Sequence, residues 1–309
     1  MITSVFKKST PLNYSLVVIL ILVFFFIFQI KDPSWVSSYF LAFQKVSLLC
    51  FILASFFLIN FIVKKNGLSK DNGYAILFYL LFVLFFPTIF NDSNVIYANF
   101  FILLALRRLI SLQSLKASKE KIFDAAFWIF VASLFQFWSI LFIILVYISI
   151  IFHVSRDYRN WVLPFIALLA VIILFYMTSL ILNFDAIAFI QERAVVDFRI
   201  DYFKNNYENA ALSIYTAVAL FFVTSMLMTL SNRPQIVHSS YKKVVACFFI
   251  AAFVYIISPN KSNDLLLFSI APLTIMATSH VEYVQQKLNN EIVYYTLIVC
   301  SLFTFFSQL

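Results

Sequence analysis

Residues 86–108, FPTIFNDSNVIYANFFILLALRR, contain the end of one apolar run, a short polar turn, and a second apolar run that stops at Arg107 and Arg108. The turn carries Asp92, which sets a carboxylate at the edge of the apolar layer. Two apolar helices joined by a polar turn are typical of helical membrane proteins, because a helix satisfies its backbone hydrogen bonds internally in lipid. We therefore expect a membrane hairpin here, and the rest of the chain extends the same pattern.

The composition of the whole chain indicates a membrane protein. Of its 309 residues, 63% are hydrophobic and 12% are charged, and the mean hydropathy is +0.95. A soluble domain of this length would need far more polar residues to cover its surface. Apolar runs of about 20 residues recur along the chain, as transmembrane helices require. The sequence therefore predicts an all-α, polytopic helical membrane protein in which residues 1–309 form a single integral membrane domain, with no soluble domain.

Hydropathy over about 19 residues at a time predicts about eleven transmembrane helices. The block 123–153 is one long apolar run interrupted near Gln136. It predicts either two short spans or a re-entrant hairpin, which would reduce the total to about nine. The predicted spans cover roughly residues 13–30, 39–63, 74–90, 95–112, 123–136, 138–153, 162–183, 211–230, 244–258, 265–280 and 291–307.

The distribution of basic residues predicts the orientation in the membrane. With the N-terminus inside, sixteen of the 22 lysines and arginines fall in inner segments, five fall in outer segments, and Lys45 falls within a span. An excess of basic residues is typical of cytoplasmic loops. We expect a multi-pass protein of the bacterial inner membrane with a cytoplasmic N-terminus and a periplasmic C-terminus.

Several functional classes are disfavoured. The net charge of +8 does not indicate a nucleic-acid partner, because the basic residues mark the ends of apolar runs and do not cluster on one face. The three cysteines and three histidines form no metal-ligand pattern, so we expect neither a metal nor a cofactor. Transporters usually carry glycine in interrupted helices. The only two glycines fall in one inner loop, which favours a rigid scaffold over a transporter.

One outer connection is long, and it covers roughly residues 182–210. Apolar residues recur there at steps of three and four, while Glu192 and Arg193 fall on the opposite side. This spacing predicts an amphipathic helix that lies against the outer membrane face. A solvated surface helix is an equally good interpretation.

Two carboxylates are candidates for chemistry at the outer face. Asp32 follows the first span in QIKDPSW, and Asp92 precedes the fourth. Two carboxylates at the opening of one outer cavity could act as a general base and as a group that stabilises charge. The alternative is that each aspartate caps a helix N-terminus. Asn99 lies two helical turns beyond Asp92 on the same face, where it predicts a cavity wall or an interhelical hydrogen bond.

Outer basic residues are candidates for binding a phosphate. Lys261 lies in the turn SPNKSND, and Arg193 and Arg199 lie in the long outer connection. Arginine and lysine form charge-assisted hydrogen bonds with phosphate oxygens. Contact with lipid headgroups is the alternative for each residue. No Gly-rich phosphate loop, G-x-S-x-G or HExxH motif occurs in the sequence, so enzyme chemistry of the soluble type is not indicated.

The order of these features resembles the polytopic glycosyltransferases of the C-type fold, which transfer sugars from polyprenyl-phosphate carriers at the non-cytoplasmic face. In that family an acidic residue follows the first helix, a second lies near a later helix end, and basic residues hold the carrier phosphate. The resemblance covers roughly residues 86–176 and 255–280 and assigns these roles to Asp32, Asp92 and Lys261. The segment NKSNDLLLFSIAPLTIMATSH is similar to the family's basic outer turn followed by a helix with an internal proline.

The chain differs from that family in having a short first outer loop, KDPSWVSS, and less sequence after the core. The whole sequence also resembles an inner-membrane family of flavobacteria-type bacteria, a resemblance that implies no activity. Our leading hypothesis is a glycosyltransferase-like protein that binds a polyprenyl-phosphate-linked sugar at the periplasmic face. Asp32 and Asp92 would be catalytic, and Lys261, Arg193 and Arg199 would bind the phosphate. The alternative is a non-catalytic membrane subunit of an envelope complex for secretion, motility or export.

Overall fold

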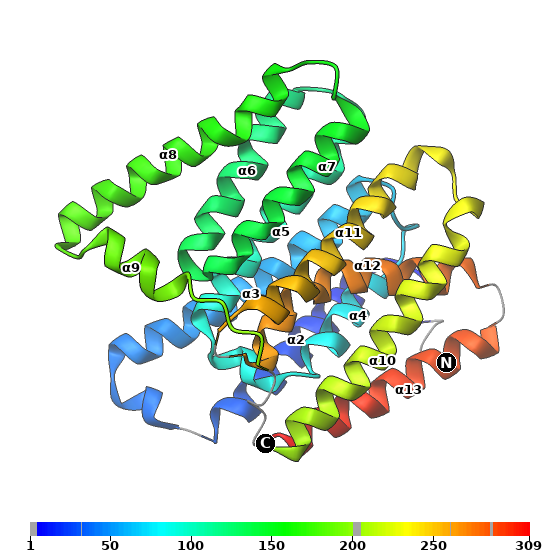
Figure 1. Ribbon diagram of the computed structural model, residues 1–309. Helices are drawn as coiled ribbons and strands as arrows, with labels where there is room; N and C mark the ends of the chain where they lie inside the picture. The colour runs from blue at the N-terminus through cyan, green and yellow to red at the C-terminus, as the bar shows by residue number, and fades with distance from the viewer. Residues whose placement is uncertain (1–4, 32, 200–204, 260, 285–286) are drawn as a thin grey trace.

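The computed structural model describes residues 5–31, 33–199, 205–259, 261–284 and 287–309, and no β-strand occurs among them (Figure 1). The elements are α-helices and short 3₁₀ helices, the latter labelled η. In chain order they are α2 (Pro11–Gln29), η1 (Pro33–Ser37), α3 (Tyr39–Lys65), α4 (Tyr74–Val83), η2 (Pro87–Asn91), α5 (Ser93–Ile110), η3 (Ser111–Ser114), α6 (Ser118–Phe135), η4 (Phe137–Phe142), α7 (Ile143–His153), α8 (Arg159–Leu182), α9 (Ala186–Arg193), α10 (Asn206–Thr229), η5 (Leu230–Asn232), α11 (Gln235–Ile257), η6 (Asn263–Leu266), α12 (Leu267–Tyr283) and α13 (Lys287–Ser307).

The predicted all-α, polytopic architecture is confirmed. By length and apolar composition, eight helices of the described chain are able to cross a membrane. The other three predicted spans fall on α4, which is short, on α6, whose first turns are charged, and on η4 with α7. The eight long apolar helices are α2, α3, α5, α8, α10, α11, α12 and α13.

Helices α6 and α7 cover the predicted block 123–153, and their ends lie beside the two ends of α5. The corner between them at Gln136 lines one cavity with Asp92, at the start of α5. At the other end of α7, His153 Nε2 lies 3.2 Å from the Nζ of Lys243, which donates to the Leu109 carbonyl near the end of α5 at 2.6 Å. Helices α6 and α7 therefore each extend along α5 from one of its ends to the other. The division of 123–153 into two transmembrane spans or a re-entrant hairpin stays a prediction.

Helix α12 lies at the centre of the bundle and packs against α4 (Figure 1). In its apolar segment 94% of the residues are buried, against 17% in α8, which faces outward. Every residue of α4 is buried as well. Aromatic rings fill the space around it, with Phe78 stacked on Tyr294 at 4.8 Å and Phe86 packed edge-on against Tyr215 at 5.0 Å. Rings take the place of the small residues that usually let membrane helices approach closely.

The described ends of the chain lie at opposite ends of the bundle. Near the start of α4, the Gly73 N–H donates to the Phe6 carbonyl at 2.8 Å. Beyond the end of α4, the Gln308 amide donates to the Phe85 carbonyl at 3.0 Å. We call the end that contains the C-terminus of α3 and α5 the basic end, because both helices finish there in paired cations. The opposite end, which contains Asp92, is the acidic end.

The loop between α3 and α4 begins with a tight turn at Gly67. This residue has φ +65°, in the left-handed region that favours glycine. Its N–H donates to the Lys64 carbonyl at 3.2 Å, and the Leu68 N–H donates to the Val63 carbonyl at 3.0 Å. This pair of bonds is the Schellman arrangement, which satisfies the last carbonyls of a helix.

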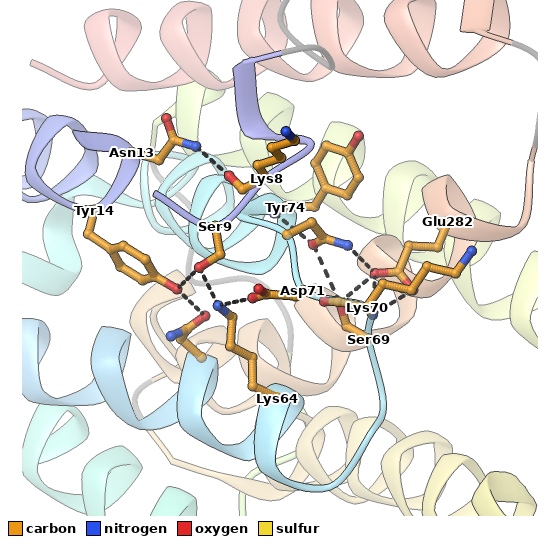
Figure 2. A network of polar contacts seen from close by, with 12 residues as sticks. Lys8, Ser9, Asn13, Tyr14, Lys64, Ser69, Lys70, Asp71, Tyr74 and Glu282 are labelled. Atoms are coloured by element: carbon orange, nitrogen blue, oxygen red, sulfur yellow. Dashed lines mark hydrogen bonds and ion pairs between the residues drawn. The ribbon is translucent and has the colours of Figure 1, made fainter. Parts of the chain in front are cut away.

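The same loop is held at the basic end by Glu282 of α12 (Figure 2). Its carboxylate accepts hydrogen bonds from the Ser69 hydroxyl, from the Lys70 N–H at 3.1 Å and from the Asn72 amide at 2.5 Å. Beside it, the Lys64 ammonium pairs with Asp71 at 2.9 Å and lowers the pKa of that carboxyl. The network joins the central helix α12 to the ends of α3 and α4.

We expect Glu282→Ala to lower the free energy of unfolding by about 2 kcal/mol, because several donors lose a charged acceptor at once. Denaturant unfolding in mixed micelles would measure the change. Glu120→Ala is the matched control, since Glu120 is exposed and has no hydrogen-bond partner among the described residues. Equal stabilities of the two variants would contradict the role given to Glu282.

Candidate functional site

Asp92 caps helix α5. Its backbone is extended, with φ −85° and ψ 94°, and its Oδ1 accepts a hydrogen bond from the Val95 N–H at 3.0 Å. Pro87 begins η2 just before the turn, where its fixed φ suits the start of a helix. The cap interpretation of Asp92 is therefore correct. Among the described residues, only Oδ1 of this carboxylate forms a hydrogen bond, so its second oxygen remains available for another role.

A cavity of about 230 Å³ lies beside this cap at the acidic end, and we call it the polar cavity. It is formed by the start of α5, the corner between α6 and η4, the end of α9 and the segment before α12. Its lining residues are Asp92, Asn94, Val95, Phe135, Gln136, Phe137, Glu192, Arg193, Pro259, Ser262 and Leu265.

Arg193 is the only cation among the described residues that line the polar cavity. Its Nη1 donates to the Leu134 carbonyl at 2.7 Å, and its guanidinium carbon lies 3.7 Å from the centre of the Phe189 ring. The carbonyl and the ring fix the plane of the guanidinium. A guanidinium carries five N–H donors, so most of them remain for a ligand in the cavity.

A second cavity of about 190 Å³ opens between α6, α8 and α9, and we call it the apolar groove. It lies along α8, whose apolar face is largely exposed and faces lipid in a membrane. Phe137 and Arg193 line both the apolar groove and the polar cavity. The two spaces therefore meet at Arg193. The groove is lined by Phe130, Ser133, Leu134, Phe137, Ile140, Leu168, Val171, Ile172, Phe175, Phe189, Ile190 and Arg193.

A second carboxylate, Asp264, is buried close to the polar cavity. It lies on η6 between two cavity-lining residues, Ser262 and Leu265, and it accepts a hydrogen bond from the Thr88 hydroxyl. This bond joins η6 to η2, the element that leads into the Asp92 cap. The site residues proposed from sequence did not include Asp264. Its position in an outer turn directly before a long apolar helix was the available signal.

Lys261 stabilises the fold of the chain after α9. Its side chain is buried, and its ammonium donates to the carbonyls of Asp197 and of Arg199, the latter at 2.8 Å. The ammonium therefore holds the backbone of residues 197–199. The Arg199 side chain is exposed and is not among the described groups that line the polar cavity. Of the three cations predicted to bind phosphate, only Arg193 lies at this cavity.

The long outer connection is helical over a shorter range than the spacing of its residues predicts. Helix α9 ends at Arg193, and residues 194–199 form no helix or strand. The Val195 carbonyl accepts a hydrogen bond from the Trp138 indole at 2.9 Å, and the Asp197 N–H donates to the Ile257 carbonyl at 3.1 Å. These bonds to distant elements compete with continuation of the helix.

Of the two remaining predicted residues, Asn99 does not line the polar cavity. Asp32 lies outside the described residues. Three residues earlier, the Gln29 amide donates to the Phe90 carbonyl at 3.3 Å and to the Asn91 side chain at 3.1 Å, which places the end of α2 beside the Asp92 turn. Asn99 is buried, and its Oδ1 has no hydrogen-bond partner among the described groups.

We expect Asp92→Ala to destabilise the protein by about 1 kcal/mol, because the Val95 N–H loses its acceptor. Asp92→Asn should retain wild-type stability, since asparagine caps a helix as well as aspartate does. Denaturant unfolding of both variants in the same micelles would measure the difference. A loss of stability in Asp92→Asn equal to that in Asp92→Ala would show that the charge, and not the cap, stabilises the turn.

Comparison with known proteins identifies the family. No curated protein and no solved structure matches the chain. A family model described as "Family of unknown function (DUF6427)" matches residues 5–309, nearly the whole sequence. The chain therefore belongs to the DUF6427 family, a family of unknown function.

Proposed function

We propose that this protein binds a polyprenyl-phosphate-linked sugar at its acidic end and acts as a glycosyltransferase-like protein of the bacterial inner membrane. The observation that carries the proposal is the meeting of the apolar groove and the polar cavity at Arg193. An isoprenoid chain fits an apolar groove that faces lipid, and its phosphate would then lie beside the guanidinium.

The charges of the polar cavity suit a transfer reaction. Arg193 would neutralise the phosphate as the bond between the anomeric carbon and the phosphate oxygen breaks and that oxygen takes the electron pair. Asp92 would accept the proton of the acceptor hydroxyl as its oxygen bonds to the anomeric carbon. Glu192 lines the same cavity and could orient the acceptor or the sugar hydroxyls. Asp32 would be a second carboxylate at this mouth.

The distribution of charge supports a periplasmic position for this site. Most lysines and arginines fall at the opposite end of the bundle, where α3 and α5 finish. Because basic residues are in excess on the cytoplasmic side of membrane proteins, this distribution supports an acidic end that lies outside. This orientation puts the N-terminus in the cytoplasm and the C-terminus in the periplasm.

Binding of a polyprenyl phosphate tests the role of Arg193. We expect Arg193→Gln to weaken the binding at least tenfold, because a buried or half-buried charge-assisted bond contributes about 1.5–3 kcal/mol. Arg199→Gln is the matched control and should bind as the wild type does. Native mass spectrometry of the full chain with added polyprenyl phosphate would measure both. Equal losses in the two variants would contradict the assignment of the phosphate to Arg193.

The same binding experiment tests the apolar groove. Leu168→Trp would fill the groove and reduce polyprenyl-phosphate binding, because Leu168 lines it. Leu169→Trp adds the same volume to the same helix at a side chain that is 59% exposed. It should bind normally. Wild-type binding in Leu168→Trp would exclude the groove as the isoprenoid site.

A transfer assay separates chemistry from binding. With a polyprenyl-phosphate-linked sugar as donor, we expect Asp92→Asn to bind the donor and to lose at least a hundredfold in transfer rate, the usual range for removal of a general base. Release of free polyprenyl phosphate would be the readout. A wild-type protein that binds no polyprenyl lipid and purifies with stoichiometric envelope proteins would overturn the proposal and favour the non-catalytic subunit.

A further inference from the structure

A third cavity, of about 320 Å³, lies at the basic end between the ends of α3 and α5 and the start of α6. We call it the basic cavity. Half of its lining residues are cations, and they come from three separate segments of the chain. The lining consists of Phe61, Lys65, Asn66, Arg107, Arg108, Ser111, Gln113, Ser114, Lys116 and Lys121.

Two of the five cations are engaged by the protein. Arg108 forms an ion pair with Asp124 at 2.8 Å. The Lys121 ammonium donates to the Ser111 carbonyl and to the Ser114 hydroxyl, both at 2.8 Å. These contacts fix the start of α6 against η3. The Asp124 carboxylate pairs with one of the five cations.

The other three cations have no polar partner within the described part of the chain. Lys65, Arg107 and Lys116 form no hydrogen bond or ion pair with any residue that the structure describes. The Lys121 ammonium also lies within electrostatic range of Lys65, Lys116 and Arg108. Like charges held this close repel one another unless an anion lies between them. The basic cavity therefore has the charge of an anion site.

Two of these three cations pack against one aromatic ring, and the third lies in a strained turn. The Lys65 ammonium lies 5.0 Å and the Arg107 guanidinium carbon 4.6 Å from the centre of the Phe61 ring. Lys116 lies between Leu115, with φ 55°, and Ala117, with φ 49°. Left-handed backbone is strained for residues with a Cβ, and such strain is concentrated at ligand sites. Fixed donors lose less conformational freedom when a ligand binds.

We infer that the basic cavity binds a phosphate-bearing anion. Guanidinium and ammonium groups converging from three segments match the several oxygens and the charge of a phosphate. Basic pockets between membrane helices bind phospholipid headgroups, and a soluble phosphate ester offers the same chemistry. The site lies at the opposite end of α5 from the polar cavity, so it does not depend on the function proposed there.

The experiment uses the full-length protein and two probes. Native mass spectrometry after solubilisation from vesicles of phosphatidylglycerol and phosphatidylcholine measures retention of the anionic lipid. Calorimetry with pyrophosphate in a neutral detergent at low ionic strength measures binding of a soluble phosphate. We expect the wild type to bind at least one probe. The double variant Lys65→Gln with Arg107→Gln should bind it at least tenfold more weakly.

The matched control removes two charges at the same end but outside the basic cavity. Lys242→Gln with Arg156→Gln changes two exposed side chains and should keep the affinity within about twofold. Lys116→Gln alters only an exposed turn residue and should weaken binding severalfold without disturbing helix packing. This variant decides the question if the double variant does not fold.

Retention of phosphatidylglycerol alone would identify a lipid headgroup as the ligand, and binding of pyrophosphate would identify a soluble phosphate. The inference is overturned if the wild type binds neither probe. It is also overturned if the control variant loses as much affinity as the double variant, because the effect would then come from general surface charge.

Discussion

The structure depends on the packing of α12 against α4 at the centre of the bundle. Both helices are almost completely buried, and α4 has only ten residues. The only two glycines lie in one loop, so no helix interior brings backbones together through glycine. Large rings such as Phe78 and Tyr294 fill the space between the helices. A centre filled in this way leaves little room for polar groups, and the three cavities that concern function lie at the ends or on the outer side of the bundle.

Local sequence was sufficient to predict the membrane helices and the Asp92 turn. Apolar runs define the helices because lipid leaves the backbone no other way to satisfy its hydrogen bonds. The predicted starts were too late where a helix begins with polar residues, as in α6 and α11. In α11 Lys243 is fully buried, because His153 and the Leu109 carbonyl bind its ammonium. Such partners lie about a hundred residues away in the sequence, so the hydropathy of one segment does not predict them.

The candidate site was predictable in part. Asp92 and Arg193 were visible as an outer carboxylate and an outer cation, but their common cavity depends on the corner at Gln136 and on the path of the chain after α9. Lys261 shows the limit of charge as a guide. In sequence it is an outer lysine, and in the structure its ammonium binds backbone carbonyls that were invisible until the chain was folded.

The pairing of α4 with α12 has a consequence for how the protein is made. Helix α4 ends at Val83, and α12 begins at Leu267. During synthesis, α4 therefore enters the membrane long before the helix that covers it, and it is too short to cross the lipid unaided. The earlier helices must hold it until α12 has been made. The centre of this protein is thus completed only after the helices from α5 to α11 have been synthesised.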